Sequence, residues 1–92
     1  MNIKQATEIV VKIVKKELKD KNIKVTEKTP LIGGKSLLDS MKLIEVCVKL
    51  EDYAEENSFE FDWTSSKAMS KSLSMFRNVG ELAKEFQKQS GG

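Results

Sequence analysis

The sequence predicts an all-α fold, a small irregular three-to-four-helix bundle with a long loop between the first and second helices. Three observations lead to this prediction. Apolar residues recur at helical spacing in three segments, a helix-capping pattern precedes the last of them, and strand-like alternation is confined to short runs. The 92 residues, 39% of them hydrophobic, suit one compact core, so residues 1–92 are expected to form a single domain.

The first helix is expected over residues 3–20, because apolar side chains form one stripe along it. Lysines occupy mainly the opposite side, and the helix is expected to end near residues 20–22. Residues 1–2 are expected to fray. The apolar stripe consists of Ile3, Ala6, Ile9, Val10, Ile13, Val14 and Leu18.

Residues 23–38 are typical of a long connection, since they hold the only proline, Pro30, and the pair Gly33-Gly34. The run 23–25 alternates and allows a short strand. Several apolar side chains are expected to pin the connection to the core. These are Ile23, Val25, Leu31, Ile32 and Leu37.

The second helix is expected from about Ser40 to Glu56, with Asp39 or Ser40 as its N-cap. Its apolar set is wider than one stripe, which predicts contact with several elements and places residues such as Ile44 and Leu50 in the core. The set consists of Leu43, Ile44, Val46, Cys47, Val48, Leu50, Tyr53 and Ala54.

The last helix is indicated by Asn78, a good N-cap, with Glu81 three residues later in a capping-box pattern. Before it, residues 59–63 alternate briefly and residues 64–74 are expected to form a loop or a short irregular helix. Residues 90–92 are expected to be a frayed tail. The buried positions of the last helix are Val79, Leu82, Ala83 and Phe86.

The composition excludes several classes of function. Without histidine, the chain lacks Ser-His and Cys-His nucleophile pairs, histidine metal sites and the usual proton shuttle near neutral pH. A domain of this size also leaves little room for a deep cleft. We therefore expect neither an enzyme nor a metal site, but a protein on which separate enzymes act.

The expected location is the cytoplasm. The first residues lead straight into a charged periodic segment, with no apolar signal-peptide core. The single cysteine, Cys47, forms no intrachain disulfide and is expected to be a small buried hydrophobe, not a nucleophile. No membrane span is expected, because the longest apolar runs are three residues.

Charge is distributed unevenly along the chain. Residues 1–35 hold nine lysines and four acidic residues, whereas residues 36–62 hold two lysines and eight acidic residues. The basic first helix does not predict a nucleic-acid partner, because acidic residues interrupt its lysines and no aromatic residues accompany them. The acidic second helix is either an ordinary solvated face or a surface that attracts a basic partner.

Ser40 is the candidate functional residue. In most proteins a serine that follows an aspartate at a helix start is only a cap. Here its hydroxyl is also expected where first-turn N–H groups and the helix dipole favour a phosphate.

The residues around Ser40 carry a resemblance to a known family. Leu38-Asp39-Ser40-Met41 is followed by the apolar-Glu-apolar run 43–46, then by the alternating run 59–61 and by the helix entry at residues 76–82. In this order and spacing the chain resembles the acyl carrier protein family, which includes aminoacyl and peptidyl carriers. Lys42, Lys49 and the overall charge of +2 depart from typical fatty-acid carriers. The run Leu37-Leu38-Asp39-Ser40 resembles instead the stand-alone carriers of specialised pathways.

The resemblance implies a function for several residues. Ser40 would receive 4′-phosphopantetheine from coenzyme A through a magnesium-dependent phosphopantetheinyl transferase, and Asp39 would orient that reaction. The arm's thiol would carry an acyl group as a thioester, as in fatty acid biosynthesis and lipid metabolism. Loading ligases and acyltransferase or synthase enzymes would be the partners of a monomeric carrier. The residues expected to recognise them are Met41, Glu45, Lys49, Asp52 and Glu56.

Two alternatives stay open. The chain could be an aminoacyl or peptidyl carrier, or it could be an unmodified helical protein-interaction module that uses its acidic helix only for docking.

Overall fold

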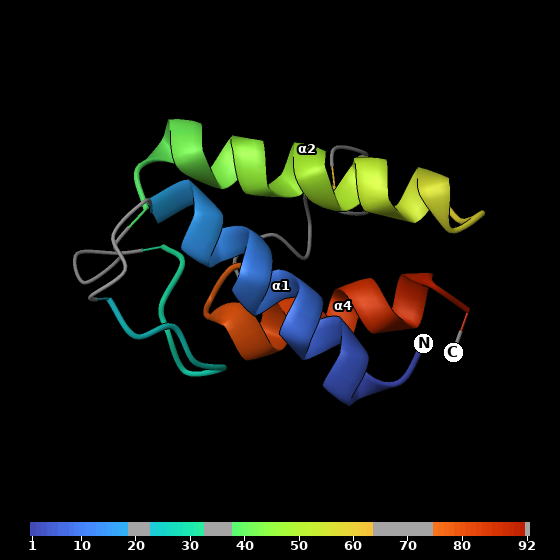
Figure 1. Cartoon of the computed structure of the whole chain (residues 1–92), viewed down its shortest axis with the longest axis horizontal. Coiled ribbons are helices and arrows are strands. Elements are labelled where there is room, and N and C mark those ends of the chain that lie inside the picture. The colour runs from blue at the N-terminus through green and yellow to red at the C-terminus, as the bar shows by residue number, and fades with distance from the viewer. Residues whose placement is uncertain (19–22, 33–37, 64–74, 92) are drawn as a thin grey trace.

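The structure, a computed structural model, describes residues 1–18, 23–32, 38–63 and 75–91. Within these ranges it is all-helical. The helices are α1 (Ile3–Leu18), α2 (Ser40–Glu56) and α4 (Val79–Gln89), shown in Figure 1. No strand occurs in the described part, which has one isolated bridge, between Pro30 and Asn78. The predicted all-α class is confirmed.

Helix α1 packs against both other helices, and it lies between α2 and α4 in Figure 1. It runs antiparallel to α2. The two helices are close where α1 ends and α2 begins, and they diverge toward the start of α1. Both chain termini lie side by side at the wide end, where the Gln87 side chain donates to the Met1 carbonyl oxygen at 3.4 Å.

Helix α1 begins with a reciprocal cap that the sequence analysis did not identify. The Asn2 side chain accepts from the Gln5 N–H at 2.8 Å, and the Gln5 side chain accepts from the Asn2 N–H at 3.0 Å. The predicted stripe needs one correction, because Ile3 at this end is exposed. The buried residues are Ala6, Val10, Val14 and Glu17.

Helix α2 has the predicted bounds, but Ile44 and Val48 do not belong to its buried face as expected. Both are exposed. At 3.6 residues per turn, Ile44 lies about 160° around the helix from the buried Val46, so its side chain points away from the core. The buried residues are Val46, Cys47, Leu50 and Ala54.

The connection is held to the start of α4 by main-chain hydrogen bonds and forms no strand at residues 23–25. The Thr29 carbonyl oxygen accepts from Val79 at 3.0 Å, and the Glu27 carbonyl oxygen accepts from Gly80 at 2.7 Å. A Cβ on Gly80 would lie 3.1 Å from that Glu27 oxygen, so the close approach favours glycine.

The predicted anchors of this connection differ in burial. Val25 and Leu31 are buried, and Ile23 packs partly against the core. Ile32 is exposed instead of buried, whereas Leu37 lies outside the described residues.

Helix α4 begins as predicted, with the Asn78 side chain accepting from the Glu81 N–H at 2.8 Å. Its Phe86 ring stands at the centre of an aromatic cluster, with ring centroids 5.2–6.0 Å away. The neighbouring rings are those of Tyr53, Phe59 and Phe61. After the helix, Gly91 adopts a φ of 94° and its N–H bonds to the Lys88 carbonyl oxygen. The loop or short helix expected at residues 64–74 lies outside the described residues.

Candidate functional site

The start of α2 is built around Asp39. This residue has extended backbone angles (φ −83°, ψ 174°), and its side chain accepts from the Lys42 N–H at 2.8 Å. Its carbonyl oxygen accepts from the Leu43 N–H at 3.0 Å. Asp39 is therefore the N-cap, and Ser40 is the first residue of the helix. Just before them, Leu38 is buried and fixes the entering chain to the core.

At this end of α2, some backbone N–H groups have no hydrogen-bond acceptor within the helix. The first four N–H groups of a helix have no acceptor within the helix. Asp39 already accepts from the N–H of Lys42, so Ser40 and Met41 carry the other first-turn amides that could donate to an anion. Partial positive charge at a helix N-terminus adds to their attraction for a phosphate.

An exposed apolar stripe follows directly on α2. It consists of Met41, Ile44 and Val48, whose side chains are 68%, 47% and 41% exposed. Because residues spaced by three or four positions share one helix face, these side chains form a single surface. Sequence reasoning assigned Met41 to recognition and missed the other two. The signal was present in their spacing from Met41, but they were read as part of the buried set.

Acidic residues flank this stripe. Glu45 and Asp52 are exposed, as is Glu56 at the end of the helix. Farther along α2, a groove of about 410 Å³ also has an acidic lining. The residues that line it are Glu51, Asp52, Glu55, Phe59, Glu60 and Phe61. The solvent-facing side of α2 therefore combines an apolar stripe with a negative field, which suits a partner that presents apolar and basic groups.

Lys49 has a contact that the sequence did not predict. Its ammonium group forms an ion pair with the carboxylate of Glu17 on α1. The Glu17 side chain is only 5% exposed, so the pair joins the end of α1 to the middle of α2 and compensates a buried charge. Lys49 thus takes part in helix packing.

Cys47 is buried, with 1% of the residue exposed, as predicted for a small buried hydrophobe. Burial, helped by the nearby Glu51 carboxylate, raises the pKa of this thiol to about 12. It therefore stays protonated near neutral pH, and a thiol in that state is a poor nucleophile.

Within the described ranges, two kinds of feature were not found. No group of three or more histidine, cysteine, aspartate or glutamate side chains is arranged to hold a metal ion. None of the helices described is long and apolar enough to cross a membrane.

Comparisons of the chain with protein-family models, with curated proteins and with solved structures found no match. Function is therefore inferred from the geometry at the start of α2 and from the exposed surface of that helix.

Proposed function

We propose that this chain is an acyl carrier protein, modified on Ser40 with 4′-phosphopantetheine and able to present an acyl group to partner enzymes. The observation that carries this proposal is the start of α2. Ser40 opens the helix, while the preceding Asp39 provides the cap within the run Leu38-Asp39-Ser40-Met41. The capping task is filled by Asp39, which supports a separate role for the serine.

The residues at this end fit a phosphodiester. The amides of Ser40 and Met41 could donate to its oxygens, and the helix dipole favours its negative charge. Asp39 would orient the transferase reaction in addition to capping the helix. When attached, the arm supplies a flexible thiol that holds the acyl group as a thioester. The chain itself would then need no catalytic residue, and separate enzymes would load and unload it.

Partner enzymes would dock on the exposed side of α2. Met41, Ile44 and Val48 supply apolar contact next to the attachment residue. Glu45 and Asp52 would attract basic groups and guide the approach. Glu56 extends the same charge toward the end of the helix. Lys49 would act there through its bond to Glu17, by holding α2 in position.

The apolar stripe also supports a second function, an unmodified interaction module. An exposed row of large apolar side chains serves docking whether or not the serine is modified. An aminoacyl or peptidyl cargo stays within the carrier proposal, because the same serine and arm would hold it. For either function we propose a cytoplasmic location, which rests on the single buried cysteine and the lack of disulfides.

Intact-mass measurement tests the carrier proposal. The purified protein is incubated with coenzyme A, magnesium and a broad-specificity phosphopantetheinyl transferase. We expect the mass of one arm to be added to the wild type and to Ser58→Ala, a matched control at the other end of α2. The Ser40→Ala variant should gain nothing. If several transferases leave the wild type unmodified, the docking module is the better account.

A further inference from the structure

A groove lies beside the second half of α2, where the chain returns after the end of that helix. Its volume is about 410 Å³, which lies in the range of small-molecule sites. We call it the acidic groove. Its described lining consists of Glu51, Asp52 and Glu55 from α2, followed by Phe59, Glu60 and Phe61.

The end of α2 brings residues 59–61 to this position. Ser58 adopts the left-handed conformation, with a φ of 65°. The Ser58 N–H donates to the Glu55 carbonyl oxygen at 3.2 Å, and the Phe59 N–H donates to the Ala54 carbonyl oxygen at 3.0 Å. These two bonds are those of a Schellman motif, which ends a helix and turns the chain. The residues that follow form the second wall of the groove.

This second wall is held in place by α4. The Gln89 side chain accepts from the Asp62 N–H at 2.6 Å and donates to the Asp62 carbonyl oxygen at 2.9 Å. The rings of Phe59 and Phe61 lie against Phe86, with ring centroids 5.4 Å and 5.2 Å away. Because these contacts fix the wall within the fold itself, a ligand would have few groups to order on binding and would lose little affinity to that cost.

The charges of the lining favour a cation. Its four carboxylates belong to exposed residues, and in the described part of the chain none of them forms an ion pair. No lysine or arginine belongs to the described lining. Carboxylates that share one groove repel each other, so a bound cation lowers the free energy of the group. These carboxylates are those of Glu51, Asp52, Glu55 and Glu60.

The two rings add apolar surface to the same groove. Phe61 belongs to the core and is 1% exposed, whereas Phe59 is partly buried against the core. A metal ion would use only the carboxylates of this lining. A cation that carries an apolar body would use both the carboxylates and the rings.

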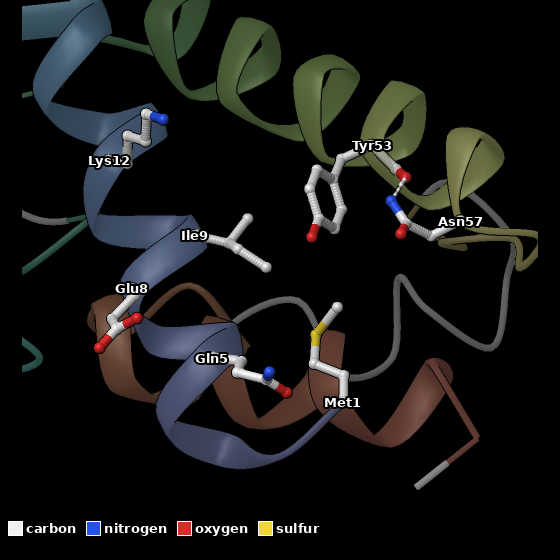
Figure 2. Close-up of a pocket in the computed structure, with 7 residues that line it drawn as sticks. All are labelled: Met1, Gln5, Glu8, Ile9, Lys12, Tyr53 and Asn57. Atoms are coloured by element: carbon white, nitrogen blue, oxygen red, sulfur yellow. Dashed lines mark hydrogen bonds between the residues drawn. The ribbon is translucent and has the colours of Figure 1, made fainter.

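A second groove, the groove at Tyr53, lies between α1 and α2 and is drawn in Figure 2. Its volume is about 500 Å³. Its described lining holds one cation, Lys12, and one carboxylate, Glu8, so its charges favour neither sign of ligand. It therefore serves as an internal comparison for the acidic groove.

We propose that the acidic groove binds a primary ammonium ion that carries an apolar body. The ammonium group donates to carboxylates of the lining, and the apolar body lies against Phe59 and Phe61. Each contact with an exposed carboxylate contributes little, so the affinity comes from several of them together with burial of the apolar body. The site does not depend on modification of Ser40, because none of its described lining residues belongs to the start of α2.

Titration of the unmodified full chain with hexylammonium, followed by amide chemical shifts, tests the proposal. Hexanol and hexanoate share the six-carbon body, and magnesium supplies positive charge without that body. We expect saturable shifts centred on Glu55, Phe59 and Glu60 with hexylammonium, and weaker binding of all three controls. The assignment would be overturned if hexanol, hexanoate or magnesium bound these residues as tightly as hexylammonium, if hexylammonium gave no saturable shift, or if its shifts centred on Ile9 and Tyr53.

Two double variants locate the charge contact. Glu55→Gln/Glu60→Gln should weaken hexylammonium binding about tenfold, the size expected for two partly exposed ion pairs. The control Glu8→Gln/Glu27→Gln makes the same charge change on exposed residues outside the acidic groove and should leave the affinity unaltered. If both double variants weaken binding equally, the effect comes from net charge and the proposed contact is wrong. Far-UV circular dichroism checks that both are folded.

Discussion

At the scale of single residues, Asp39 and Ser40 divide the start of α2 between two tasks. Asp39 accepts from the Lys42 N–H and thereby satisfies one of the first-turn amides. A variant without this side chain would have a less stable helix. It would also lack the carboxylate that we propose to orient the modification of Ser40. The capping task and the proposed orienting task can be separated, because asparagine caps helices about as well as aspartate but carries no charge.

Asp39→Asn should therefore unfold at nearly the wild-type temperature but gain the phosphopantetheine arm more slowly. Asp39→Ala should lose about 1 kcal/mol of stability in addition. Thermal unfolding and a time course of intact mass measure the two effects. Modification of Asp39→Asn at the wild-type rate would show that the carboxylate serves only as a cap.

At the scale of elements, α2 has two apolar faces with different consequences. Val46, Leu50 and Ala54 lie in the core, whereas Ile44 and Val48 are exposed on the opposite side. The first face stabilises the fold through burial of apolar surface. The second face contributes little to the stability of the fold, because it stays exposed, and it suits contact with a partner.

Two truncations distinguish these faces. Leu50→Ala removes a fully buried side chain and should lower the free energy of unfolding by about 2–5 kcal/mol. Ile44→Ala should change it by only about 0.5 kcal/mol, as for most surface substitutions. Urea denaturation of both variants gives the comparison. A loss of similar size in Ile44→Ala would mean that this side chain packs in the core after all.

At the scale of the whole molecule, charge is segregated between α2 and the elements behind it. Lys15 and Lys16 lie in the last turn of α1, whereas α2 carries an exposed row of carboxylates. Such segregation orients a charged partner during approach and so affects the association rate more than the final affinity.

Glu45→Lys should therefore slow modification by the transferase about threefold at low salt, and added salt should reduce the difference. Glu27→Lys makes the same change in net charge on an exposed residue of the connection and should have a much smaller effect. Initial rates from intact mass at two salt concentrations give the comparison. Equal rates for wild type and Glu45→Lys would remove this residue from the docking surface.

Most of the fold follows from local signals. The bounds of α2 and the Asn78 cap were predicted because helical periodicity and capping residues act within a few positions of each other. The burial of Glu17 and its bond to Lys49 could not be predicted, since the two residues are 32 positions apart and meet only through packing.

The candidate site was predicted in part for the same reason. The N-terminal position of Ser40 is a local property, whereas the exposure of Ile44 and Val48 depends on which side of α2 meets the core. A helix with apolar residues around much of its circumference does not reveal which of them are buried. The groove at Tyr53 arises from the divergence of two helices, which no short segment encodes.

The adjacency of Met1 and Gln87 has a consequence for how this domain can be joined to other polypeptides. Both ends of the chain leave the molecule on one side, and the start of α2 lies at the other (Figure 1). Domains with neighbouring ends tolerate insertion into longer polypeptides. This domain could therefore be fused at either end, or inserted into a host protein, with the start of α2 on the side away from the junction.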